Sequence, residues 1–178
     1  KPEFEYNLDL IRAFLDDIDT AIVEPHAPYL TFPVEELTEQ KMKLATLLNL
    51  HRDKEWIFLH PGSGGSANNL SLQQYSQLVL GLEPDAEFIL TAGPGEQEKA
   101  QQLQALIKQG GKHAVIYDKN DGLVDFTRSL ACADLFIAGS TGPLHIAAAL
   151  DVPTVGFFPA KRSATPLRWR PLNSMDRH

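Results

Sequence analysis

Apolar residues recur along the chain in two alternating patterns. Uninterrupted apolar runs of three to five residues alternate with longer stretches in which apolar residues return every third or fourth position. Short apolar runs are typical of strands that are covered on both faces, and the longer spacing predicts helices with one buried face. The predicted strands are 56–59, 88–90, 114–117, 135–138 and 154–158, and the predicted helices between them are 72–82, 96–109, 123–131 and 143–150. This alternation predicts an α/β fold, a Rossmann-like parallel sheet with helices on both faces.

Two further helices are predicted before the first strand. The apolar steps in 4–18 give one helical face, and a proline-rich stretch separates this segment from a second helix that starts near Val34. The expected apolar face of the second helix consists of Val34, Leu37, Leu44, Leu47 and Leu48. We therefore divide the chain into 1–52, an interdomain linker helix with the segment that leads into the domain, and 53–178, the Rossmann-like domain.

The composition excludes several classes of protein. The 178 residues, 43% hydrophobic and 22% charged, indicate one folded globular domain rather than a disordered chain. A net charge of −7 argues against nucleic acid as a partner. The single Cys132 cannot form an internal disulfide, which fits a reducing, cytoplasmic compartment. We see no signal peptide or membrane span, and because the first residue is Lys1 we expect a piece of a longer chain.

The loop after the first predicted strand is rich in glycine and serine. Residues 60–69 read HPGSGGSANN, and the next helix is expected to be capped by Ser71. Backbone N–H groups at Gly64 and Gly65, with the hydroxyls of Ser63 and Ser66, suit an anion such as a phosphate. The loop lacks the Gly-Lys-Ser/Thr ending of a P-loop and is not GxGxxG. Phosphate binding and an ordinary surface turn both remain open.

A second candidate site follows the fourth predicted strand. There Gly139 and Ser140 lead through Thr141 and Gly142 into a helix that starts with proline. Ser140 or Thr141 can cap this helix, and its free N–H groups then face the edge of the sheet where ligands bind. His145 lies one turn further on, where its ring can donate to the same anion. The alternative is a buried histidine satisfied by a carbonyl.

The turn at 92–96 ends in Glu96, which either complements the helix dipole or reaches the hydroxyls of a ribose. The residues leave these two interpretations equal. The six histidines are scattered without metal-ligand spacing, and the G-x-S-x-G elbow of serine hydrolases is missing. The sequence therefore predicts neither a metal centre nor a serine nucleophile.

Several motifs together resemble glycosyltransferase family 9, the ADP-heptose:lipopolysaccharide heptosyltransferases. The most specific is 134–150, DLFIAGSTGPLHIAAAL, and it is supported by 59–63, 92–96, 165–173 and 7–11. The family has a GT-B fold, in which two Rossmann-like domains face each other across a cleft. The resemblance implies that this chain is the carboxyl-terminal half, which holds the nucleotide-sugar donor, and that the amino-terminal acceptor domain of the same protein is absent.

The resemblance also implies a role for each candidate residue. Ser63 and the following residues would face the diphosphate, as would the helix start with His145, which would stabilise the leaving group. Glu96 would face the ribose, and the loop that contains Asp121 and Leu123 would lie along the adenine. The full set of implied donor contacts is Ser63, Gly64, Gly65, Ser66, Asn68, Glu96, Asp121, Leu123, Ser140, Thr141, Gly142, His145, Lys161 and Arg162.

The chain departs from the family at two points. Many members have Asp where this chain has Ser140, and many have Lys near the position of Asn68. Lys161 or Arg162 is the candidate to supply the missing positive charge. These departures bear on the identity of the sugar more than on nucleotide-sugar binding.

The implied reaction is an inverting, metal-independent transfer to a lipopolysaccharide core or another glycan acceptor. The resemblance implies an ADP-linked donor, which is a substrate, so no cofactor is expected. The general base would lie in the absent domain, and the protein would contact the inner membrane peripherally. The alternatives are a nucleotide-sugar epimerase of GT-B fold, a non-catalytic nucleotide-binding module and a dinucleotide oxidoreductase, the last disfavoured by the missing GxGxxG.

Overall fold

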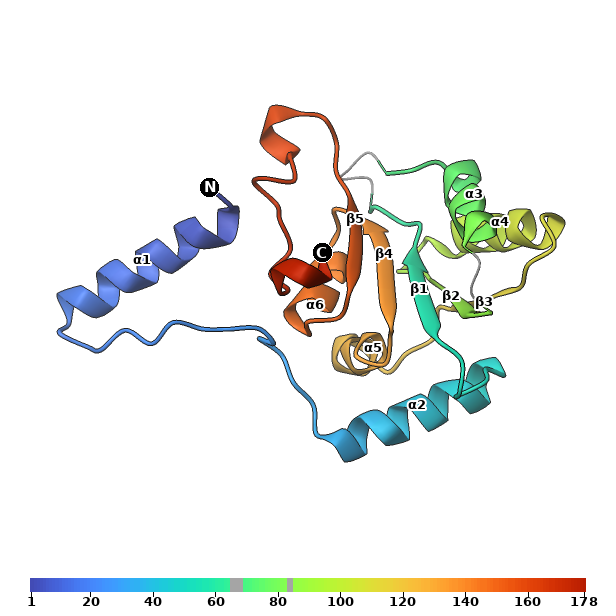
Figure 1. Ribbon diagram of the computed structural model, residues 1–178, viewed down its shortest axis with the longest axis horizontal. Coiled ribbons are helices and arrows are strands. Elements are labelled where there is room, and N and C mark those ends of the chain that lie inside the picture. The colour runs from blue at the N-terminus through green and yellow to red at the C-terminus, as the bar shows by residue number, and fades with distance from the viewer. Residues whose placement is uncertain (65–68, 83–84) are drawn as a thin grey trace.

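A computed structural model describes residues 1–64, 69–82 and 85–178 (Figure 1). Five parallel strands form one sheet in the order β3-β2-β1-β4-β5. They are β1 (Trp56–His60), β2 (Glu87–Thr91), β3 (Ala114–Tyr117), β4 (Leu135–Gly139) and β5 (Thr154–Phe157). Because every pair is parallel, all five carboxyl ends meet at one edge of the sheet, where such folds bind their ligands.

Helices cover both faces of this sheet. Helices α3 (Leu72–Gly81) and α4 (Gln97–Gln109) pack together on one face, and α2 (Val34–Leu48), α5 (Leu123–Leu130) and α6 (Gly142–Ala149) cover the other. Strand β1 alternates between the two: Trp56 and Phe58 enter the core under α2 and α5, while Ile57 and Leu59 enter the core under α3 and α4. This two-sided burial is why the strand has no polar position except at its end.

The predicted elements are confirmed in kind and order, with ends that shift by one or two residues. Ser71 caps α3 as predicted: its Oγ accepts from the Gln74 N–H at 3.2 Å, and Gln74 Oε1 accepts from the Ser71 N–H at 2.9 Å. The apolar face assigned to the second helix is partly wrong. Val34 and Leu47 are 74% and 55% exposed, because α2 presents only a narrow strip around Gln40 and Leu44 to the rest of the domain.

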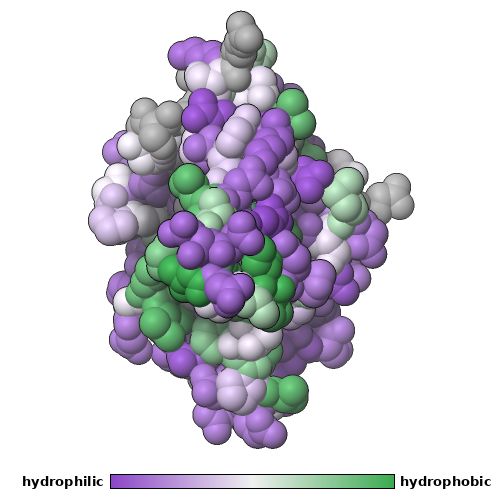
Figure 2. Space-filling view, turned by 90° about the vertical axis from the view of Figure 1, so that its left-hand side faces the viewer, coloured by the Kyte–Doolittle hydropathy of each residue, from purple (hydrophilic) through white to green (hydrophobic). Residues whose placement is uncertain are grey.

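Helix α1 (Glu3–Asp17) stands away from the sheet and has no buried residue (Figure 1). Figure 2 views the molecule from this side and shows hydrophobic and hydrophilic residues mixed on the surface. The start of α1 touches the C-terminal segment, where the Glu3 N–H donates to the Arg168 carbonyl at 2.7 Å. The connection to α2 passes over the end of α6, since Tyr29 and Leu30 both donate to the Ala149 carbonyl. In the part of the chain that the structure describes, no helix has the length and apolar character needed to cross a membrane.

The proposed division at residues 52/53 stays a prediction. Leu44 and Leu50 nevertheless belong to the same core cluster as Trp56 and Phe136. Helix α2 thus packs as part of the sheet domain, whereas α1 does not.

Candidate functional site

A cavity of about 720 Å³ opens where the carboxyl ends of β1, β2 and β3 meet. Its walls come from the end of β1, the turn after β2, the loop between β3 and α5, and the start of α6. The lining residues are His60, Ala92, Gly93, Pro94, Gln97, Asp118, Lys119, Asn120, Gly122, Leu123, Phe126 and Pro143. Separate loops thus bring together residues that are far apart in the sequence, as the parallel sheet predicts.

One wall of the cavity is the segment 118–122 with the first turns of α5. Phe126 lies in this wall and stacks on Tyr117, the last residue of β3, with ring centroids 6.2 Å apart and an interplanar angle of 16°. The predicted site residue Leu123 lines the cavity and is 67% exposed. The other predicted residue of this loop, Asp121, turns the other way, toward Lys43 of α2. The wall combines apolar side chains with polar backbone, which suits a flat heteroaromatic ring.

The carboxylate of Glu96 joins the loops that follow β1 and β2. It accepts hydrogen bonds from the Gly64 N–H at 3.0 Å and from the Gly93 N–H at 3.1 Å. A Cβ at Gly62 would overlap the Glu96 carboxylate, so a larger residue there would displace this side chain. Burial alone would raise the pKa of Glu96, but the two N–H donors and His60 outweigh it and hold this pKa below its ordinary value. The charged carboxylate therefore occupies the Gly64 N–H, one of the donors that the sequence assigned to a phosphate.

His60 is buried beside Glu96. Its Nδ1 lies 2.8 Å from Thr91 Oγ1, and its Nε2 lies 3.5 Å from Glu96 Oε2. Burial lowers the pKa of His60 even though the Glu96 charge opposes this shift. The Thr91 hydroxyl beside Nδ1 also donates to the Leu59 carbonyl at 3.3 Å, so it connects His60 to the backbone of β1.

The loop after β1 is closed by Asn69. Its amide donates to the carbonyls of Pro61 and Gly62 at 3.3 and 3.2 Å, and its Oδ1 accepts from the Tyr75 hydroxyl at 2.7 Å. The end of β4 passes so close that a Cβ on Gly139 would meet Asn69 Oδ1 at 2.7 Å. Asn69 therefore links the loops after β1 and β4, the two segments assigned to an anion.

The start of α6 presents backbone donors, as the sequence predicts. Thr141 occupies the N-cap position, but its hydroxyl donates back to the Gly139 carbonyl at 3.2 Å and does not cap the helix. Gly142 is exposed, and Pro143 lines the cavity. The orphan N–H groups of the first turn are thus left for water or a ligand.

Ser140 and His145 are half-buried at either side of this helix start. Burial, with a smaller effect of His178, lowers the pKa of His145, so the imidazole is neutral at pH 7. A neutral ring can still donate one hydrogen bond to an anion.

The remaining predicted residues do not line the cavity or lie outside the described residues. Lys161 is exposed just before the short 3₁₀ helix η1 (Arg162–Ala164), beyond the end of β5, and it is not among the residues that line the described cavity. Arg162 lies within η1. Gly65, Ser66 and Asn68 lie outside the described residues, and Ser63 lies at the end of the described loop.

Of the residues that line the cavity, only Leu123 was among the implied donor contacts; His60, Gln97 and Phe126 are examples of those that were not. His60 carried a signal, since it is a polar residue at the end of an apolar strand and precedes a glycine-rich loop. Gln97 and Phe126 look like ordinary first-turn and core positions of helices. Among the described residues, His, Cys, Asp and Glu side chains form no group of three that could hold a metal ion.

The family model of glycosyltransferase family 9 (heptosyltransferase) matches residues 8–178. The chain belongs to glycosyltransferase family 9. It is 54% identical over 180 residues to a putative glycosyltransferase of Haemophilus influenzae, covering 100% of this chain and 51% of that protein. It is 24% identical over 136 residues to lipooligosaccharide heptosyltransferase 2 of Campylobacter jejuni, covering 75% of this chain and 43% of that protein. The chain thus spans about half the length of these relatives.

Solved structures of low sequence identity share the fold of this family 9 chain. The Escherichia coli ADP-heptose lps heptosyltransferase II aligns with a TM-score of 0.68 at 18% identity, over 86% of this chain and 44% of that one. The E. coli heptosyltransferase WaaC with ADP aligns with a TM-score of 0.51 at 18% identity, over 75% of this chain and 39% of that one. The expected fold class, a Rossmann-like half of a GT-B fold, is confirmed.

Proposed function

We propose that this protein transfers a sugar from a nucleoside-diphosphate sugar, ADP-heptose, to a lipopolysaccharide core acceptor, and that this chain is its donor-binding part. The observation that carries the proposal is the cavity at the carboxyl edge of β1, β2 and β3, with the start of α6 beside it. The names of relatives and neighbours, which mention heptosyltransferase activity and ADP, support the choice of donor. No cofactor is part of the proposal, because the nucleotide-sugar is a substrate.

The donor would lie across the loops in a fixed order. The base would rest on the wall formed by 118–122 and Phe126, and the ribose would lie toward Gly93 and Glu96. The diphosphate would then reach the first turn of α6, where N–H groups and the positive end of the helix dipole stabilise negative charge.

The proposed chemistry is an inverting transfer without a metal. An acceptor hydroxyl attacks the anomeric carbon, the bond between that carbon and the diphosphate oxygen breaks, and the electron pair stays on the diphosphate. The acceptor proton passes to a carboxylate expected outside this chain. The contribution of residues 139–145 is to stabilise the charge that develops on the leaving diphosphate, and His145 would donate one of the hydrogen bonds.

Binding to the full-length protein tests the donor site. Isothermal titration with ADP, UDP, GDP and NAD should show a preference for ADP, and Thr141→Ala and His145→Ala should each weaken ADP binding. A preference for UDP or GDP would keep the glycosyltransferase and discard ADP-heptose. A preference for NAD would instead favour a dinucleotide oxidoreductase.

A transfer assay separates the enzyme from a binding module. The full-length protein, given ADP-heptose and a truncated lipopolysaccharide core, should release ADP and extend the core, and His145→Ala should slow transfer about 10²- to 10³-fold if it stabilises the leaving group. Tight ADP binding without transfer to any core acceptor would favour the non-catalytic module.

A further inference from the structure

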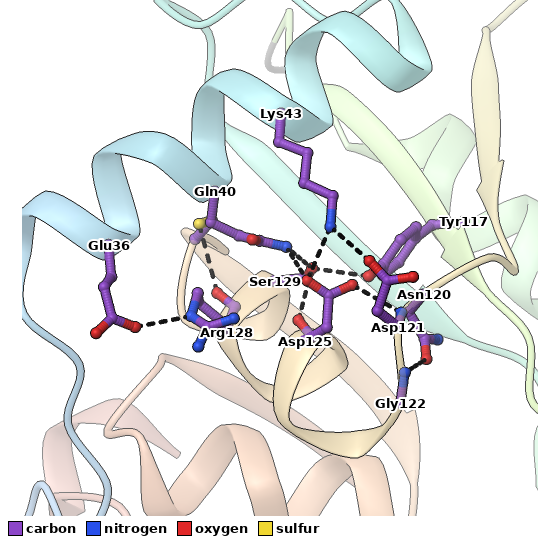
Figure 3. Close-up of polar contacts among 11 residues, drawn as sticks. Glu36, Gln40, Lys43, Tyr117, Asn120, Asp121, Gly122, Asp125, Arg128 and Ser129 are labelled. Carbon is purple, nitrogen blue, oxygen red and sulfur yellow. Dashed lines mark hydrogen bonds and ion pairs between the residues drawn. The ribbon is translucent and has the colours of Figure 1, made fainter.

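Polar side chains fill part of the interface between α2 and α5, directly behind the cavity wall (Figure 3). Gln40 and Asp125 are 5% and 7% exposed, and Ser129 is fully buried. The Gln40 amide donates to Asp125 Oδ1 at 3.1 Å and to Ser129 Oγ at 2.8 Å. Buried polar groups are costly unless they are paired, so these three side chains hold one another in a defined arrangement.

This network forms hydrogen bonds next to both ends of the segment 118–122. At the start, the hydroxyl of Tyr117 lies 2.8 Å from Ser129 Oγ. At the end, Asp125 Oδ2 accepts from the Asp121 N–H at 3.0 Å. The residues between these two anchors, Asp118 to Asn120, line the cavity.

Lys43 of α2 supplies the positive charge of the network. Its Nζ lies 3.0 Å from Asp125 Oδ1 and 3.2 Å from Asp121 Oδ2 (Figure 3). The Asp125 side chain is 9% exposed, so this ion pair is screened less than the pair with Asp121, which is 86% exposed. Burial opposes the charge on Asp125, but hydrogen bonds from the Asp121 N–H, Lys43 and Gln40 lower its pKa below the ordinary value.

Strand β3, which leads into this segment, pairs only with β2 among the described strands, and Phe126 stacks on its last residue, Tyr117. This strand is at the edge of the sheet, so no further strand supports the loop that follows it. The segment also borders a second hollow of about 220 Å³, which lies against Leu47 and Leu48 of α2. The position of this wall therefore depends on the polar contacts with α2.

We propose that Lys43 is a positioning residue for the donor nucleoside: by holding Asp121 and Asp125, it fixes the segment 118–122 as the surface on which the base lies, and so sets the discrimination between bases. The proposal rests on the proposed function, since it assumes that a nucleoside occupies the cavity. Lys43 itself contacts no ligand in this arrangement. Its effect passes through the backbone of the loop.

The test uses the full-length protein with Lys43→Met, which keeps an unbranched side chain, one atom shorter, and removes its charge. We expect the Kd for ADP to rise about three- to tenfold and the ratio of the Kd values for UDP and ADP to fall. The Kd for inorganic pyrophosphate should stay unchanged, because the loop after β1 and the start of α6 do not touch Lys43. Hydrogen exchange of the amides in 118–124 should become faster.

Two control variants separate the effect of the Lys43 charge from a general effect of substituting a lysine in α2. Lys43→Arg can still reach both carboxylates and should restore ADP affinity and base selectivity. Lys41→Met removes a lysine from the same helix that lies over the Trp56 ring at 4.9 Å, and it should leave both unchanged.

The outcomes separate the two proposals. If the wild-type protein binds no nucleoside diphosphate, the proposed function fails. If it binds ADP but Lys43→Met has the wild-type affinity and selectivity, the positioning role is wrong. An equal loss of pyrophosphate and ADP affinity would also overturn it, because that result indicates general damage to the fold.

Discussion

Helices α1 and α2 have the same length of 15 residues and a similar mixture of apolar and acidic positions, yet they differ in what they bury. Helix α2 places Leu44, 1% exposed, in the core and adds the buried amide of Gln40. Helix α1 buries nothing, and its Leu10, Ile11 and Phe14 are more than half exposed. From the spacing of their apolar residues alone, both helices would be predicted to pack into the core.

The comparison shows that the apolar face of a helix must be covered by some partner, but the face does not determine which element covers it. Helix α2 meets the sheet because Leu50 and Trp56 follow it closely in the chain and share its core cluster. Helix α1 is separated from α2 by residues 18–33, which form no helix or strand. The role of α1 as an interdomain linker, which the resemblance implies, would provide the missing partner.

Shortening the chain tests this contrast most strongly. Removal of residues 1–52 should abolish cooperative unfolding, because losing Leu44 and Leu50 from the core costs at least about 5 kcal/mol, comparable to the stability of a domain. Removal of residues 1–18 should change the free energy of unfolding by less than about 0.5 kcal/mol. Urea unfolding followed by tryptophan fluorescence measures both. A wild-type midpoint for the chain 53–178 would contradict the assignment of α2 to the core.

Single substitutions make the same comparison without deleting backbone. Leu44→Ala should lower the free energy of unfolding by about 2–5 kcal/mol, because it leaves a cavity in a closed core. Leu10→Ala, in the chain 1–178, should change it by less than about 0.5 kcal/mol. Equal effects in urea unfolding would mean that α1 is packed as tightly as α2.

The buried carboxylate behind α2 should give stability a specific pH dependence. Because the folded-state pKa of Asp125 is lowered, its contribution is complete above the ordinary carboxyl pKa of about 4 and is lost as the pH falls through the folded-state value. Asp125→Asn should cost about 1–2 kcal/mol at pH 7 and should flatten the acid limb of the stability curve. Urea midpoints across a pH series measure this, and parallel curves for the two proteins would show that another group dominates.

The smallest effect is expected on the surface of α1. Arg12 pairs with Asp9 at 3.0 Å and with Glu24 at 2.7 Å, all in exposed positions. Arg12→Gln should leave the unfolding midpoint unchanged, since solvent screens exposed pairs, whereas Lys43→Met should lower it measurably. Thermal melts at low and high salt compare the two. A larger shift for Arg12→Gln would indicate that α1 is coupled to the folded domain.

The position of the candidate site could be predicted from the sequence, but the contacts of its side chains could not. The turns at the strand ends indicated loops that surround the cavity, and Leu123 and Pro143 do line it. The roles of individual side chains were less accessible. Glu96 was expected either to complement a helix dipole or to face a ribose, and the sequence did not indicate that its carboxylate also accepts hydrogen bonds from the Gly93 N–H and from the Gly64 N–H, 32 positions away.

The amino-acid sequence by itself determined the order of strands and helices along the chain, the parallel sheet and the edge of the sheet at which the cavity opens. Those properties follow from local periodicity and from the short loops that join each strand to its helix. Only the tertiary structure decided which amphipathic helix is buried, which way Asp121 turns and how Lys43 reaches Asp125, 82 residues away. Such contacts depend on the distances between elements after folding, and neither periodicity nor spacing along the chain contains them.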